Sequence, residues 1–534
     1  MPLTPTTTPT GEEPPSRTGD DACPGALRLH RADDGFLARV RLPGGLLTAS
    51  QATELALAAQ ELGDGALDLT SRGNVQLRGL GAACGGELAD RLRAAGLLPS
   101  ASHERVRNVA LSPLSGLDGG GRVDVTPWVR ELDHLLCAAP DAAGLSGRFL
   151  FAVDDGRGDV AALGADVTLI ATAPGDALLR VATGHPAPPA GAAVPDPVLL
   201  RIAAVDAPRA ALTAALAFLA AARASDAKAW RSWELPGGPE RYALFARELD
   251  AALAAAGIAA RPWPHDGRPP HVMPAGFAAP LPGLVPAPDG GRTALSVAAP
   301  LGRFAGAQWH LLADAARAGA GTLRVTPWRG VVVPGLTPAA AAARLAELAG
   351  TGVLADAGSA GYGVGACTGR PGCAKSLADV RADAADTIAR ASTRASLPAA
   401  RGTGPARTDR PAPLLPVYWS GCERRCGHPQ GRWVDVLAGV DGYRVTVTGT
   451  EHTARTASDT AEQRAGKAPT AERETGTDTR SGPGPEAEAG PAPAGAAGRA
   501  EHAGRPAPSY QQPPDLPVAP EELAGVLAAA RTVP

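Results

Sequence analysis

Two separated stretches of the chain show the same order of apolar and polar positions. In residues 42–80, an apolar strand-like segment is followed by helical spacing over 51–62 and then by a second strand-like segment. Residues 299–336 repeat this order, with the helical spacing at 308–318, at a constant offset of about 256 residues. We therefore predict a duplicated α/β unit in a pseudo-twofold arrangement, with a cleft between the two copies.

Composition divides the rest of the 534 residues, which include 65 glycines and 52 prolines. From Thr448 to Asp515 there is no Val, Ile, Leu, Met, Phe or Trp, so burial cannot offset the entropy of ordering this stretch. The predicted organisation is a disordered N-terminus at 1–25, a first half-domain at 26–95, a larger domain at 100–260, a Pro-rich linker at 261–290, a second half-domain at 291–350, a cysteine-containing domain at 360–447, a disordered tail at 448–515 and a short C-terminal helix at 516–534.

The overall charge argues against two classes of partner. Lys and Arg number 51 against 54 Asp and Glu, a net charge of −3, which disfavours nucleic acid and anionic membrane surfaces as main partners. The longest alanine-leucine stretch, Ala210 to Ala222, is shorter than the roughly 20 residues that a membrane span needs. Residues 1–21 have neither a basic nor an apolar signal region. We expect a soluble, cytoplasmic protein.

Four of the seven cysteines form two tight pairs. Cys367 and Cys373 make a C-x5-C motif, and Cys422 and Cys426 make a C-x3-C motif, both rich in glycine. Neither has the C-x2-C spacing usual for structural zinc, and four thiolates in flexible loops suit a [4Fe–4S] cluster. A zinc site with unusual spacing and four unrelated thiols are the alternatives. The remaining cysteines, expected to be ordinary buried thiols, are Cys23, Cys84 and Cys137.

Polar side chains alternate along two predicted strands of the first copy. Arg39 and Arg41 alternate on one strand, so both should point to the same face. The next strand carries a second row, which consists of Arg72, Asn74, Gln76 and Arg78. Such rows can pair with the carboxylates of a ligand, although solvated strand edges would show the same alternation.

The motifs at 39–45 (RVRLPGG), 70–76 (TSRGNVQ) and 107–109 (RNV), with the cysteine array, resemble the sulfite and nitrite reductase superfamily over most of residues 26–447. The resemblance implies an α/β (α+β) fold of duplicated ferredoxin-like repeats around a central cleft. It makes 26–95 and 291–350 ferredoxin-like half-domains, 100–260 a reductase-like domain and 360–447 the cluster domain. It also implies that a polycarboxylated tetrapyrrole binds in the cleft beside the cluster.

Family residues carry over position by position. The four paired cysteines match the cluster ligands, and Cys426 matches the thiolate that bridges the cluster to sirohaem iron in the reductases. Arg41 and Arg107 match the reductases' anion site, but its Lys-Phe-Lys motif is Arg148-Phe149-Leu150 here. The expected catalytic residues are Arg41, Arg107 and Arg148, and the expected substrate-binding residues are Arg39, Arg72, Asn74, Gln76, Arg78 and Arg329. Since arginine holds its proton and leucine carries none, sulfite reductase activity is expected to be weak or absent.

Within the superfamily, residues 326–329, 365–374 and 420–429 are most similar to the precorrin-3B synthases. This resemblance implies hydroxylation of precorrin-3A with O2, closure of a γ-lactone, and a separate electron donor such as a reductase or ferredoxin. It also implies a mononuclear non-haem iron, for which no ligand set stands out. His428 is as much a packing residue as a ligand candidate, and His103 and His134 are expected at the surface. The alternatives are a sirohaem-dependent sulfite or nitrite reductase and a non-catalytic tetrapyrrole-binding electron-transfer protein.

Overall fold

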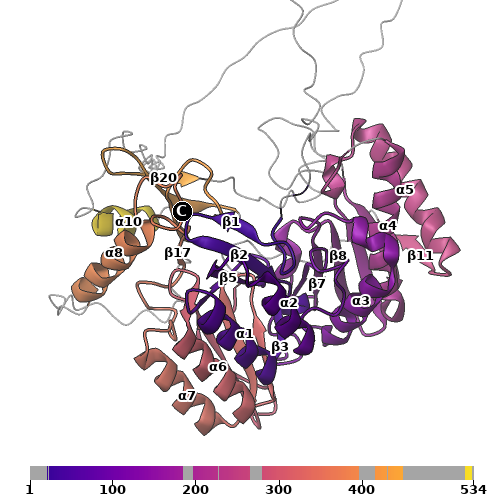
Figure 1. Cartoon of the computed structure of the whole chain (residues 1–534). Coiled ribbons are helices and arrows are strands. Elements are labelled where there is room, and N and C mark those ends of the chain that lie inside the picture. The colour runs from indigo at the N-terminus through magenta and orange to yellow at the C-terminus, as the bar shows by residue number, and fades with distance from the viewer. Residues whose placement is uncertain are drawn as a thin grey trace, which may run out of the picture. The chain divides into compact units, whose positions relative to one another are not determined.

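The computed structural model describes residues 21, 23–183, 196–225, 228–264, 279–395, 415–429, 431–448 and 523–531 (Figure 1). The tail predicted to be disordered, at 448–515, lies outside them from residue 449 onward, as do residues 1–20 of the N-terminal segment. Asp21, which is described, bonds through its carboxylate to the Gly147 amide and the Ser146 hydroxyl. The described part of the N-terminal segment is thus fixed to the larger domain.

The first half-domain is a five-stranded sheet in the order β1-β2-β5-β4-β14, covered by helices. Its elements are β1 (His30–Ala32), β2 (Gly35–Val40), α1 (Ala49–Leu62), β4 (Ala66–Leu69), β5 (Val75–Leu80), α2 (Gly85–Ala94) and β14 (Arg303–Ala305). Thr48 and Gln51 cap the start of α1 reciprocally, as a capping box does. The helix ends at Leu62, and its C-cap is Gly63, where a Cβ would lie 2.6 Å from the Arg78 carbonyl oxygen.

The second half-domain repeats this architecture, in the strand order β12-β13-β16-β15-β3. Its elements are β3 (Leu46–Thr48), β12 (Gly283–Pro286), β13 (Thr293–Ala298), α6 (Gly306–Ala318), β15 (Thr322–Val325), β16 (Gly330–Leu336) and α7 (Pro338–Gly350). The predicted duplication, and the α/β fold class with it, is confirmed.

The two copies exchange one strand each, which sequence patterning did not predict. β3 from the first copy pairs with β15 of the second, and β14 from the second pairs with β4 of the first. The helices α1 and α6 pack against each other (Figure 1), and the buried Trp309 indole donates a hydrogen bond to the Ala52 carbonyl at 2.8 Å. Since each sheet needs a strand from the other copy, the half-domains share one hydrophobic core.

The strand-like segments at 69–80 and 325–336 are each interrupted by a turn, which corrects the expectation of continuous strands. Thr70 closes the first turn by accepting from the Asn74 amide through its hydroxyl oxygen, and Thr326 does the same for Gly330 in the second. β5 and β16 begin only after these turns.

The larger domain is a six-stranded sheet in the order β11-β10-β9-β8-β7-β6, with three helices. Its elements are β6 (Val109–Leu111), α3 (Thr126–Ala138), β7 (Phe151–Asp154), β8 (Val167–Ala173), β9 (Asp176–Val181), β10 (Val198–Ala203), α4 (Ala207–Ala224), α5 (Gly238–Ala255) and β11 (Ala260–Pro262). They share a second hydrophobic core.

One described helical segment, Ala204–Ala224, is long and apolar enough to cross a membrane, judged by length and composition. This segment is longer than the alanine-leucine stretch at 210–222, so its length alone does not exclude a membrane span. However, 56% of its apolar window is buried, and α4 packs on β8 and β9. A core helix passes the same test, so the segment is weak support for a membrane span.

The cysteine-containing domain is a four-stranded sheet in the order β17-β18-β19-β20, with two helices beside it (Figure 1). Its elements are β17 (Val364–Ala366), α8 (Val380–Ala395), β18 (Val417–Ser420), β19 (Trp433–Ala438), β20 (Tyr443–Thr448) and α10 (Leu523–Arg531). Leu523 and Leu527 of α10 are buried against this sheet. The C-terminal helix therefore docks on the domain that carries the cysteines.

Candidate functional site

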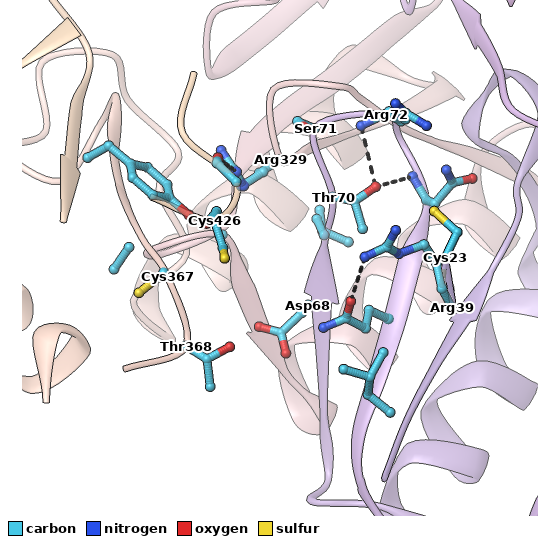
Figure 2. A pocket seen from close by; sticks show the side chains of 18 of the residues that line it. Cys23, Arg39, Asp68, Thr70, Ser71, Arg72, Arg329, Cys367, Thr368 and Cys426 are labelled. Atoms are coloured by element: carbon cyan, nitrogen blue, oxygen red, sulfur yellow. Dashed lines mark hydrogen bonds between the residues drawn. The ribbon is translucent and has the colours of Figure 1, made fainter. Parts of the chain in front are cut away.

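A cavity of about 580 Å³ lies where both half-domains, the larger domain and the cysteine-containing domain meet. Figure 2 shows Cys367 and Cys426 on one side of it and Arg39, Arg72 and Cys23 on the other. Its wall is rich in arginine and contains few acids. The lining arginines are Arg39, Arg72, Arg78, Arg148, Arg231, Arg329 and Arg381, and the lining acids are Asp68 and Glu234.

Three of the lining arginines are neutralised by carboxylates. Arg78 binds Asp34 through two hydrogen bonds of 2.8 Å. Arg381 binds Asp68 at 2.7 Å, and Arg231 binds the fully buried Asp166 at 2.8 Å. These pairs fix the cavity wall and contribute little net charge to it.

The other lining arginines have no carboxylate partner among the described residues. They are Arg39, Arg72, Arg148 and Arg329. Arg39 donates to the Gln76 side-chain oxygen at 3.1 Å, and Arg72 donates to the Gly147 carbonyl at 3.2 Å. The cavity therefore presents several positive charges that nothing described neutralises, and a ligand with several anionic groups would do so.

A further unpaired charge lies directly behind this wall. The Arg41 side chain is 3% exposed, and neither terminal nitrogen of its guanidinium has a hydrogen-bond partner in the described structure. Burial, with the nearby positive charge of Arg39, lowers the pKa of Arg41. Burial likewise lowers the pKa values of Arg39 and Arg72. An unpaired buried cation is costly, so a bound anion here would stabilise the fold.

The cysteine loops start at the same edge of one sheet. β17 and β18 are parallel neighbours, and each ends directly before a cysteine motif, at Cys367 and at Gly421-Cys422. Because the carboxyl ends of adjacent parallel strands lie side by side, the topology brings the two motifs together. The Gly421 amide donates to the Cys367 sulfur at 3.3 Å. A Cβ on Gly421 would lie 1.9 Å from the Ser376 hydroxyl, so this approach of the loops requires glycine.

The four thiols fit the donor set of an iron–sulfur cluster without forming a closed site. Cys367 and Cys426 line the cavity, and burial raises the pKa of Cys367. Within the described ranges, no three or more His, Cys, Asp or Glu side chains lie close enough to hold a metal. The loops that carry the thiols follow the paired strands β17 and β18.

Each half-domain holds one cysteine loop. From the first, Arg78 donates to the Gly372 carbonyl at 3.2 Å, and Asp33 accepts from the Ala374 amide. Arg381 extends these contacts by joining Asp68 to the Cys367 carbonyl. From the second, Arg329 donates to the Gly427 carbonyl at 2.5 Å.

Backbone strain is concentrated around this site. The non-glycine residues with positive φ in the described structure are Leu301 at 50°, Arg329 at 57° and Arg425 at 45°. Leu301 and Arg329 line the cavity, and Arg425 lies inside the C-x3-C motif. Each such conformation costs on the order of 1 kcal/mol for a residue with a side chain. Two of the strained positions therefore line the cavity and the third lies in a cysteine loop, which makes this region a candidate functional site.

The expected substrate-binding residues all line the cavity, with their side chains from β2, β5 and the turns before β5 and β16. However, these residues differ in whether their polar groups are free to bind a ligand. The buried Asn74 amide accepts from the Leu42 main chain and donates to Asn108, so it supports the turn. Arg72 lies in the turn rather than on the strand, as does Arg329 in the second copy.

The structure does not bring all the expected catalytic residues together. Arg148 lines the cavity and stacks on Trp230 at 4.9 Å. Arg107 is absent from the cavity wall, because it is buried and bound to Asp133 at 2.6 and 2.7 Å. Leu150 is buried in an apolar cluster.

Two further expectations about single residues are wrong. His103 is 4% exposed, not at the surface, because Ser100, Ser102 and the Ala139 carbonyl bind its ring. Cys23, expected to be an ordinary buried thiol, is half-buried and lines the cavity.

The two other histidines have separate outcomes. His134 is exposed as expected, and His428 stacks on Trp433 with ring centroids 4.6 Å apart. The stacking favours a packing role for His428.

Sequence reasoning missed one wall of the cavity. Arg231, Trp233 and Glu234 reach it from the segment before α5, and Arg231 stacks on the Trp233 ring at 3.8 Å. The Ser232 amide bonds to Asp166, which anchors the segment. The alternation of tryptophan and charged residues at 230–234 was the available signal.

Comparison with known proteins agrees with the duplicated fold. The nitrite/sulfite reductase ferredoxin-like half domain matches residues 28–95 and 285–350. The solved structure of the NirA protein of Mycobacterium tuberculosis superimposes with a TM-score of 0.56 at 20% identity, covering 78% of this chain and 75% of that one. The chain therefore contains two segments that match this half-domain model, and it shares the fold of the NirA structure.

Curated relatives match over shorter stretches. A ferredoxin–nitrite reductase of Synechococcus elongatus is 38% identical over 128 residues, 23% of this chain and 25% of that protein. A precorrin-3B synthase of a Sinorhizobium species is 34% identical over 149 residues, 28% of this chain and 32% of that protein. These matches span about a third or less of either relative.

Proposed function

We propose that the cavity binds a polycarboxylated tetrapyrrole and that the chain acts as a precorrin-3B synthase. The observation that carries this proposal is the group of cavity arginines without carboxylate partners, beside two cysteine loops. Guanidinium groups bind carboxylates bidentately, and several of them around one cavity favour a ligand with several carboxylates. The similarity to a precorrin-3B synthase over 149 residues supports the same choice.

In this function the thiols of Cys367, Cys373, Cys422 and Cys426 would hold a [4Fe–4S] cluster, which supplies electrons one at a time. The reaction adds one atom of O2 to precorrin-3A and releases the other as water, so it consumes two electrons and two protons. A separate reductase or ferredoxin would supply the electrons. The residues of this chain bind and orient the substrate: Arg39, Arg72 and Arg148 contact its carboxylates, and Trp233 offers an aromatic surface to the macrocycle.

A sirohaem-dependent nitrite or sulfite reductase is the second candidate, because a nitrite reductase matches at 38% identity. The side chains at the positions that match the reductases' anion site count against it. Reduction of these oxyanions needs repeated proton delivery, for which lysine is suited. Here Arg148 replaces the first lysine of the reductases' motif, Leu150 is buried among apolar side chains, and Arg107 is bound to Asp133.

A direct test offers the purified full chain each substrate in turn. Turnover of precorrin-3A with O2 and a reductant is expected, with no oxidation of reduced viologen by sulfite or nitrite. Viologen oxidation at rates typical of a reductase would contradict the proposal. Binding of the tetrapyrrole without turnover would instead indicate a carrier.

A further inference from the structure

The C-x3-C loop is held by two side chains that act on its main chain. The Tyr418 hydroxyl donates to the Cys426 carbonyl at 2.6 Å, and Arg329 donates to the next carbonyl, that of Gly427, at 2.5 Å. The two side chains also contact each other, because the Arg329 guanidinium lies 5.5 Å from the centroid of the Tyr418 ring. Adjacent carbonyls of one loop are therefore bound by a single interacting pair.

This pair is closely fitted to the loop. Tyr418 is 3% exposed, so its hydroxyl is shielded from solvent where it donates to the loop. Gly427 has φ of +87°, and a Cβ there would lie 2.8 Å from the Tyr418 hydroxyl and 3.3 Å from the Arg329 guanidinium. The contact thus depends on glycine at this position.

Arg329 has a positive φ, a backbone conformation that the glycine at the equivalent position of the first half-domain adopts without strain. In the turn of the first half-domain the equivalent position is Gly73, with φ of +69°, against +57° for Arg329. Both turns have the same hydrogen bonds: the amides of Gly73 and Arg329 donate to the carbonyls of Thr70 and Thr326, each at 3.1 Å. Glycine would suffice for the turn, so the turn does not explain the arginine side chain, which must have another role.

We propose that Arg329 and Tyr418 are positioning residues, which fix the main chain at Cys426 and Gly427 and so direct the Cys426 thiol into the cavity. This role rests on the proposed cluster site, but the contacts belong to the chain itself. Arg329 would then act through the cysteine loop, in addition to any direct contact with the substrate. It would also link the second half-domain to the cluster.

Two variants of the full-length chain test the role, Arg329→Gly and Tyr418→Phe. The matched control is Tyr443→Phe, because Tyr443 is buried in the same sheet but binds Asp383 and not the loop. The measurements are the thermal midpoint, the alkylation rate of Cys426 by iodoacetamide in cluster-free protein, and the electron paramagnetic resonance spectrum of the reduced, reconstituted cluster.

We expect Arg329→Gly to melt no lower than the wild type, because it removes strain. In both test variants, Cys426 should be alkylated about three- to tenfold faster, the effect of losing one hydrogen bond. The reduced cluster should show an altered spectrum in both, and Tyr443→Phe should match the wild type in Cys426 reactivity and spectrum.

Unchanged alkylation and an unchanged spectrum in both variants would overturn the positioning role. A lowered midpoint in Arg329→Gly with unchanged Cys426 reactivity would show that the arginine merely stabilises the fold. If the wild type takes up no cluster, the proposed function fails, while the alkylation rates still decide whether the pair holds the loop.

Discussion

The two half-domains hold equivalent places in the fold but secure their cysteine loops by different means. The first uses charged side chains, in which Asp33, Arg78 and Asp68 bind the C-x5-C loop directly or through Arg381. In the second, Arg329 binds the C-x3-C loop from a strained conformation. Duplication thus supplied two equal scaffolds, and the side chains diverged.

This difference shows how a symmetric framework acquires an asymmetric site. The turns at 70–74 and 326–330 have the same hydrogen bonds, so the backbone was conserved between the copies. The first copy keeps glycine at the position with positive φ and supplies Arg39 and Arg72 to the cavity wall. The second has arginine there and reaches the cysteines. Changes at Arg72 and at Arg329 should therefore have separable effects on ligand binding and on the cluster.

The largest effect is expected at the cysteines. Cys422→Ser should abolish cluster absorbance and all turnover, since a [4Fe–4S] cluster needs four ligands. Cys84→Ser is the control, because Cys84 lies in the first half-domain away from the cavity wall. Iron content and visible spectra measure the result, and a cluster retained by Cys422→Ser would refute the ligand assignment.

The next largest effect is expected from breaking an ion pair in the first half-domain. Arg78→Ala should lower the free energy of unfolding by about 2–4 kcal/mol, because it leaves Asp34 without its partner. This loss is somewhat smaller than the loss expected for a fully buried ion pair. Asp34 is 24% exposed, which reduces the cost. Urea unfolding measures the change.

The control for that change is Arg91→Ala, which breaks a more exposed pair with Glu54 and Glu61. Its loss should be about 1 kcal/mol or less. Equal losses for the two variants would show that the contacts at the cysteine loop have no special weight.

Ligand binding should respond to a third change. Arg72→Ala should raise the KM for the tetrapyrrole about tenfold, the effect of one charge-assisted hydrogen bond, while iron content stays constant. Parallel kinetics and iron assays separate the two, with Arg344→Ala on α7 as the control, since that arginine pairs locally with Glu347. A loss of iron in Arg72→Ala would place this residue with the cluster instead.

The smallest effect compares the two turns directly. Gly73→Ala should destabilise the protein by about 1–2 kcal/mol, because a side chain at positive φ is strained. A Cβ there would also lie 3.1 Å from the Val325 carbonyl. Thermal unfolding of Gly73→Ala is compared with that of Arg329→Gly, which should lose no stability. Equal losses of stability in the two variants would mean that the two turns are not equivalent.

Much of the fold could be predicted from sequence, because repetition and periodicity are local properties. The offset between 42–80 and 299–336 predicted the duplication, and the helical spacing at 51–62 and 308–318 located α1 and α6 closely. The exchange of β3 and β14 could not be predicted, since the short strands carry no signal of which sheet they join.

The candidate site was predicted unevenly for the same reason. The cysteine motifs and the alternation of Arg72 to Arg78 are local patterns, and they do lie around one cavity. Arg107 was expected beside them, but Asp133 on α3, 26 residues further along the chain, binds it away from the cavity wall. Conversely, Cys23 and Trp233 line the cavity without a motif of their own.

The sequence alone determined that two similar units and four paired cysteines exist, because repeats and spacings are written along the chain. Only the tertiary structure decided which charges are neutralised. Arg78 and Arg39 look alike on their strands, but Asp34 binds the first, whereas no described carboxylate binds the second. Pairing of charges depends on distances between distant residues, and it is this pairing that leaves the cavity positive.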